Sequence, residues 1–124
     1  MVNMHLRVLV IAPPGLWRDS LRVLLLANHR VIGIDEVGDL ASGQMLFKQN
    51  NPGLILLDAS LQDVSISEMV QTFSGGTAGR PCIVLTHTSH QEQAARAAGA
   101  SAVLPEGFST IALNEALNTV IPIR

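Results

Sequence analysis

Apolar residues along this chain form short runs that alternate with longer stretches, in which apolar positions recur every three or four residues. Short apolar runs are typical of buried strands, and the longer spacing is typical of helices that bury one face. The runs predict five strands, over residues 6–11, 31–37, 54–57, 82–85 and 102–104. A helical stretch follows each run, so the pattern predicts a mostly parallel sheet with helices on both faces.

Polar residues indicate where the helices begin. Asp39 can cap a helix that runs to about residue 50, and a first helix is expected over 16–28. Ser65 and Ser89 each stand three residues before a glutamate, which is the pattern of a capping box. Each serine is therefore predicted to cap a helix.

Glycines and the last apolar stripe define the remaining segments. Gly99 is expected just after the end of the fourth helix. Residues 74–81 follow a helix and lack the Lys-Ser/Thr ending of a phosphate-binding loop, so we interpret them as a flexible connector. The last helix is predicted to turn inward the residues Leu113, Ala116, Leu117, Val120 and Ile121.

Length and composition narrow the classes of function. The 124 residues are enough for one domain, which we expect to span 1–124. Only 15% of the residues are charged, against ~25% in typical soluble domains. A net charge of −2, three Phe, one Trp and no Tyr argue against direct nucleic-acid binding by this domain.

Cysteine and hydropathy bear on location. Cys82 is the single cysteine, so no internal disulfide can form, and we interpret it as a small core residue. No apolar run approaches the ~18 residues of a membrane span, and the first residues lack the pattern of a secretory leader. A cytoplasmic location without membrane contact is therefore expected.

The functional crevice of such a fold lies at the carboxyl ends of the strands. The side chains expected there belong to Ala12, Pro13, Pro14, Asp58, Thr86, His87, Pro105 and Glu106. His87 and His90 have no evident third metal ligand and are interpreted as solvent-exposed polar residues. Trp17, beside the crevice, is interpreted as a packing residue, with an exposed contact as the alternative.

Several segments together resemble the receiver domains of two-component response regulators. Leu54–Asp58 is similar to the strand that ends in the phospho-acceptor aspartate, and Val84–Thr86 to the strand that ends in the switch hydroxyl. Ala98–Ala102 is similar to the family's Ala-Gly-Ala turn, and Leu16–Leu21 to the first helix of receivers in LuxR-type regulators. The resemblance implies a flavodoxin-like three-layer α/β/α fold with a five-stranded parallel sheet in the order 2-1-3-4-5.

The chain departs from this family where the chemistry would take place. Ala12 and Pro13 stand where receivers have two acidic residues that hold Mg²⁺, and Glu106 stands where they have a lysine that contacts the phosphoryl group. Val103 replaces the aromatic partner of the switch residue Thr86. Residues 61–63 also differ from the family's Met-Pro-Gly. The sequence therefore predicts a degenerate metal and phosphate pocket, weak or absent Mg²⁺ binding and no other cofactor.

We interpret the chain as an atypical receiver, or pseudo-receiver, that makes and breaks no bonds and acts through protein–protein contacts. The expected surfaces are the face of the fourth helix, fifth strand and fifth helix, or the first and fifth helices. A homodimer, a partner protein, a histidine kinase or an attached DNA-binding domain would use them.

Plainer roles stay open: Asp58 as a carboxylate that accepts backbone hydrogen bonds, Thr86 as a satisfied hydroxyl, and Glu106 as a solvated acid. Two functional alternatives are a conventional receiver that accepts phosphate on Asp58 and a small-molecule sensor or flavodoxin-like enzyme that uses the crevice.

Overall fold

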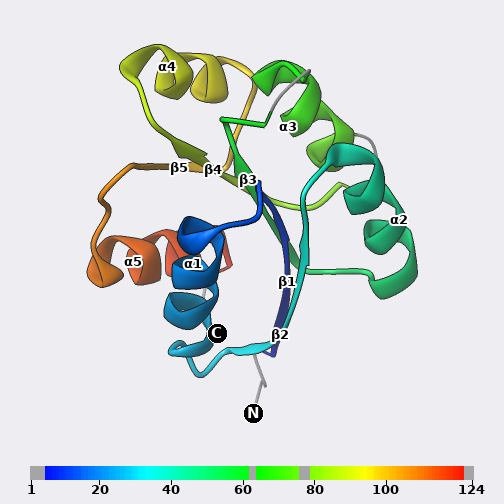
Figure 1. The fold of residues 1–124 in the computed structure, drawn as a ribbon, viewed down its shortest axis with the longest axis vertical. Helices are drawn as coiled ribbons and strands as arrows, with labels where there is room; N and C mark the ends of the chain where they lie inside the picture. The colour runs from blue at the N-terminus through cyan, green and yellow to red at the C-terminus, as the bar shows by residue number, and fades with distance from the viewer. Residues whose placement is uncertain (1–4, 62–63, 76–78, 122–124) are drawn as a thin grey trace.

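The strands of the computed structural model form one parallel sheet in the order β2-β1-β3-β4-β5 (Figure 1). The structure describes residues 5–61, 64–75 and 79–121. The strands are β1 (Leu6–Ile11), β2 (Val31–Val37), β3 (Leu54–Asp58), β4 (Cys82–Thr86) and β5 (Ala102–Pro105). The predicted strand order is confirmed, and β1 and β2 have the predicted bounds.

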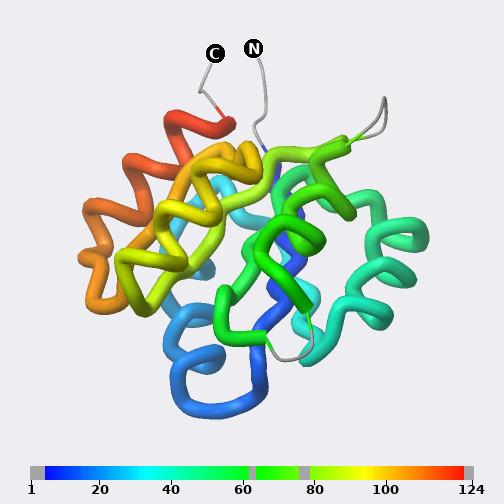
Figure 2. The backbone as a smooth tube through the Cα atoms, turned by 90° about the horizontal axis from the view of Figure 1, so that it is seen from above, coloured from blue at the N-terminus to red at the C-terminus, as the bar shows by residue number. Residues whose placement is uncertain are grey.

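Helices cover both faces of the sheet. They are α1 (Leu16–Leu26), α2 (Leu40–Asn50), α3 (Ile66–Ser74), α4 (Ser89–Ala97) and α5 (Thr110–Val120). α1 and α5 lie on one face, whereas α2, α3 and α4 lie on the other (Figure 1). Figure 2 shows α2 and α5 on opposite sides of the molecule. Within the described residues, no helix is both long and apolar enough to cross a bilayer.

Two apolar cores hold the three layers together. All five residues of β3 and all five of β4 are buried, and the first four of each are apolar, so each strand appears in the sequence as a short apolar run. Side chains of the predicted last-helix stripe pack into the core under α1 and α5, and Leu113 and Leu117 are fully buried there. Gly43 lets α2 approach β1 closely, because an added Cβ would lie 2.4 Å from Cδ1 of Ile11.

The helix caps follow the sequence with one exception. The side chains of Asp39 and Ser65 accept backbone hydrogen bonds at the starts of α2 and α3, as predicted. The prediction that Ser89 caps α4 is wrong, because Thr88 caps it and accepts from the backbone N–H of Gln91 at 3.1 Å. Thr88 and Gln91 also stand three residues apart, so the same capping pattern fits one residue earlier.

The first helix is shorter than expected. α1 ends at Leu26 instead of residue 28, because Asn28 belongs to the turn into β2. The Asn28 side chain accepts a hydrogen bond from the backbone N–H of Arg30 at 2.9 Å. Gly99 ends the fourth helix as predicted, with a φ of 92° that favours glycine. Residues 62–63 of the divergent loop and 76–78 of the predicted connector lie outside the described residues.

Candidate functional site

Asp58 lies at the carboxyl end of β3, between the ends of β1 and β4. Its Cα pairs with that of Leu85, and only 1% of the residue's surface is exposed. A carboxylate withdrawn from water in this way must be compensated by hydrogen-bond donors or by charge. The surroundings of Asp58 therefore show what this site can do.

Three donors converge on one oxygen of Asp58. The backbone N–H and the hydroxyl of Ser60 each donate to Oδ1 at 2.8 Å. The Nε2 atom of the His87 ring lies 2.9 Å from the same oxygen. The first two contacts come from a residue two positions along the chain, as in an Asx turn, and the third comes from the loop after β4. Asp58 is thus held by the protein's own groups.

His87 is not the solvent-exposed residue that the sequence suggested. Its side chain is 25% exposed, and its ring lies between two carboxylates. The second contact joins Nδ1 to Oε1 of Glu106 at 3.4 Å. The pairing of β4 with β5 explains why His87 lies beside Glu106. His87 follows Thr86 as Glu106 follows Pro105, and Thr86 and Pro105 are paired across β4 and β5.

The end of β1 offers no acidic side chain. Ala12 is buried and Pro13 is half-buried, at the positions where the resemblance implies two acids. The guanidinium of Arg18 donates to the Ala12 carbonyl at 3.2 Å and fixes the turn against α1. Gly15 closes this turn with a φ of 146°, which residues other than glycine rarely adopt.

Of the remaining predicted site residues, Thr86 and Glu106 lie at the carboxyl ends of β4 and β5, and Val103 lies within β5. Thr86 is buried, and its carbonyl accepts from the backbone N–H of Glu106 at 2.7 Å. Val103 is half-buried and packs against the core beneath α2, α3 and α4. The Glu106 side chain is 69% exposed. Strand pairing thus brings Asp58, Thr86 and Glu106 to one edge of the sheet.

Two other interpretations concern packing, and both are confirmed. Trp17 packs its ring edge-to-face on Phe108, with centroids 5.6 Å apart, which joins the start of α1 to the loop before α5. Cys82 is fully buried in the core, and burial raises the pKa of its thiol to about 12. A thiol in this state is a poor nucleophile.

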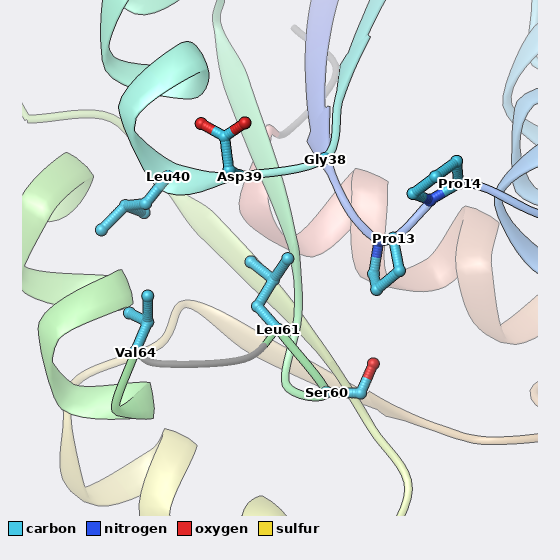
Figure 3. A pocket seen from close by; sticks show the side chains of 8 residues that line it. All are labelled: Pro13, Pro14, Gly38, Asp39, Leu40, Ser60, Leu61 and Val64. Atoms are coloured by element: carbon cyan, nitrogen blue, oxygen red, sulfur yellow. The ribbon is translucent and has the colours of Figure 1, made fainter.

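Several hollows open at this edge of the sheet, and two of them are neighbours. One, of about 350 Å³, is lined by Asp58, Ser60, His87 and Glu106 on its polar side and by residues 13–17 on its other side. The second, of about 320 Å³, shares Pro13, Pro14 and Ser60 with the first. In Figure 3 the apolar side chains of Leu40, Leu61 and Val64 line one side of it.

The electrostatics of the first hollow centre on His87. Burial lowers the pKa of its imidazole, but contacts with Asp58 and then with Glu106 outweigh burial, so the pKa is raised above the usual 6.5. The described residues include no group of three His, Cys, Asp or Glu side chains placed to hold a metal ion. The two acidic contacts therefore favour a proton on His87.

Comparison with solved structures identifies the fold. The chain is similar to a response regulator signal receiver domain from Bermanella marisrubri, with a TM-score of 0.81 and 15% identity over 93% of this chain and 97% of that one. It is similar to the receiver domain of a sensor histidine kinase from Pseudomonas aeruginosa, whose structure has a magnesium ion coordinated in the active-site cleft. That match has a TM-score of 0.82 and 16% identity over 96% and 99% of the two chains.

A signal receiver domain of a histidine kinase from Clostridium thermocellum matches with a TM-score of 0.73 and 19% identity, over 95% of this chain and 98% of that one. No protein-family profile and no curated protein matches the sequence. The chain therefore has the receiver fold expected from the sequence.

Proposed function

We propose that this chain is a receiver-type signalling domain that acts through protein–protein contacts without accepting a phosphoryl group on Asp58. The observation that carries the proposal is that Asp58 is already engaged by Ser60 and His87. Such a domain would belong to two-component signalling and would make and break no bonds itself. A second copy, a histidine kinase or an attached DNA-binding domain would be its partner.

The side chains at this edge do not fit a magnesium ion. Mg²⁺ requires a near-octahedral set of oxygen ligands, usually including one or two carboxylates. At the end of β1 the chain offers the methyl group of Ala12 and the ring of Pro13. The positive charge nearest to Asp58 would instead come from His87, at 2.9 Å. No step of the proposed function uses a metal.

A phosphoryl group would also be poorly accommodated here. It carries a charge of roughly −1.5 to −2 at neutral pH, and phosphoryl transfer depends on cations around its oxygens. The position of the family lysine is held by Glu106, which would repel such a group. A phosphoryl group on Asp58 would therefore lack a neutralising lysine and would be repelled by the Glu106 carboxylate.

The conventional alternative remains a real competitor, because Asp58 lies at the carboxyl end of β3, where the resemblance places the phospho-acceptor. Incubation with a small phosphodonor and Mg²⁺, followed by intact-mass measurement, separates the two. We expect no phospho-adduct on the wild type, as on Asp58→Ala. A stable adduct that is absent from Asp58→Ala would overturn the proposal.

A variant that restores the family residues supplies the matched control. Ala12→Asp, Pro13→Asp and Glu106→Lys together return two carboxylates and a cation to the edge of the sheet. If the absence of these three residues is what prevents phosphorylation, this variant will form a phospho-adduct under conditions in which the wild type does not. If the variant stays folded but unmodified, while a conventional receiver reacts in parallel, the explanation from these three residues is wrong.

A second candidate function follows from the 350 Å³ hollow. Its apolar wall includes Pro13, Leu16 and Trp17, and its polar side includes Asp58 and His87, a mixture that suits a small ligand. A small-molecule sensor would bind its ligand there and stabilise the fold. Thermal shift and Trp17 fluorescence with a panel of metabolites and nucleotides test this function, and saturable binding would favour it over the first proposal.

A further inference from the structure

The imidazole of His87 is held at both of its nitrogens by acidic side chains. Nε2 lies 2.9 Å from Oδ1 of Asp58, and Nδ1 lies 3.4 Å from Oε1 of Glu106. The two partners come from different elements, the end of β3 and the loop after β5. The ring therefore spans the carboxyl ends of three neighbouring strands.

This geometry selects one protonation state of the ring. A neutral imidazole has a single N–H, so one of its nitrogens would direct a lone pair at a carboxylate oxygen. An imidazolium has two N–H groups and can donate to both acids. Only the protonated ring satisfies both contacts at once.

We propose that a proton on His87 closes a latch, in which the imidazolium ties the loop between β4 and α4 to the ends of β3 and β5. Loss of the proton breaks at least one of the two contacts and releases the loop. The latch rests on side-chain geometry and does not depend on the proposed function.

The latch is connected to the first turn of α4. The backbone N–H of His87 donates to Oε1 of Gln91 at 2.7 Å, and Thr88, the next residue, caps the helix. The backbone N–H of Glu106 donates to the Thr86 carbonyl at 2.7 Å on the other side. A change at the ring would therefore reach α4 and the end of β5, one of the surfaces expected to meet a partner.

The charged side chains that line the hollows around the ring are acidic, and they favour its protonated state. Asp58 faces it from β3 and Glu106 from the loop after β5. Glu92, on α4, lines the hollow next to the ring and forms an ion pair with Arg96 at 3.1 Å. Residues 13–17, which line the other side, carry no charge. No lysine or arginine is among the described residues that line the 350 Å³ hollow or the hollow that Glu92 lines.

The direction of the pH dependence follows from these contacts. Partial burial lowers the pKa of His87, and Asp58 and Glu106 raise it by more, so the folded protein holds the proton more tightly than the unfolded chain. The latch is therefore closed below the ordinary histidine pKa of about 6.5. It opens as the pH rises through the raised pKa of the folded state.

Long-range ¹H–¹⁵N NMR of the full chain observes this proton directly. We expect both ring nitrogens of His87 to have imidazolium shifts at low pH, with a titration midpoint above 6.5. The amides of Gln91 and Glu106 should follow the same midpoint. A neutral ring throughout, a midpoint at or below 6.5, or amides that do not follow the ring would overturn the latch.

Variants identify the source of the shift. Asp58→Asn should lower the His87 midpoint, and Glu106→Gln should lower it by less, because that acid is more distant and more exposed. His90→Gln removes an exposed histidine at the start of α4, three residues after His87, and should leave the His87 midpoint unchanged. If Asp58→Asn does not fold, the His87 midpoint in Glu106→Gln tests the latch. An unchanged His87 midpoint in a folded acid variant contradicts the latch.

Discussion

Two charged residues are buried in the described part of the chain, and they lie at opposite ends of the sheet. Arg30, 4% exposed, lies just before β2 at the amino ends of the strands, and Asp58, 1% exposed, lies at the carboxyl end of β3. Their partners differ in kind. The guanidinium of Arg30 donates to neutral oxygens, whereas Asp58 is held by Ser60 and by a histidine that can lose its proton.

The Arg30 contacts join the start of β2 to the end of α5. One nitrogen donates to the Asn118 side chain at 2.8 Å, and another donates to the carbonyl of Ile121, which caps the helix. A cation at the carboxyl end of a helix is favoured by the helix dipole. Because arginine stays charged at all ordinary pH values, this contact is constant.

The two ends of the sheet therefore respond differently to a change of pH. Arg30 keeps its charge at any physiological pH, so it joins β2 to the end of α5 regardless of pH. The end that holds Asp58 depends on a histidine, whose charge changes near neutrality. A pH-sensitive element therefore lies at the edge of the sheet where receivers of this fold carry out their chemistry.

The largest effect is expected from Arg30→Met. This change replaces the arginine with an apolar side chain of similar length, so it removes two hydrogen bonds and leaves the Ile121 carbonyl without its cation. The free energy of unfolding should fall by about 1–3 kcal/mol, because hydrogen bonds to charged groups contribute on that scale. Urea unfolding checks it, and the loss should be equal at acidic and alkaline pH. A loss confined to one side of neutrality would show that the two ends do not differ as described.

His87→Gln should have a smaller effect that depends on pH. Below about pH 6.5 the protonated ring stabilises the fold, so its loss should cost about 1 kcal/mol in the free energy of unfolding. As the pH rises through the raised pKa of His87, wild type and variant should converge. Urea unfolding across this range, with His90→Gln as the control, measures the difference. A constant gap at every pH would mean that His87 acts through packing alone.

The smallest effect is expected from Glu106→Gln. This acid is 69% exposed and lies 3.4 Å from the ring, so its contribution to stability should be a few tenths of a kcal/mol at most. The change should be detectable only below the His87 midpoint. A loss as large as that of His87→Gln would place the main partner of the ring at Glu106 instead of Asp58.

The sequence was most informative where burial alone decides the structure. β3 and β4 could be predicted over their first four residues, which are buried and apolar, but not at Asp58 and Thr86, the buried polar residues that end them. The start of α4 was misplaced by one residue because Thr88 and Ser89 both fit the capping pattern, and only the backbone geometry distinguishes them.

The site could be predicted only in part. Asp58, Thr86 and Glu106 could be placed at one edge because parallel strands end together. The role of His87 depends on side-chain direction and on the register of three strands, which periodicity does not specify. The same holds for Arg30, whose partners lie 88 and 91 residues away in the chain.

The most direct test of the account is a Mg²⁺ titration near neutral pH, followed through the His87 ring signals and Trp17 fluorescence. If His87 provides the positive charge beside Asp58, both signals should stay unchanged through the millimolar range. The variant with Ala12→Asp, Pro13→Asp and Glu106→Lys should show saturable changes under the same conditions. Saturable movement of the wild-type His87 signals would show that a metal ion competes for Asp58, and it would contradict the account.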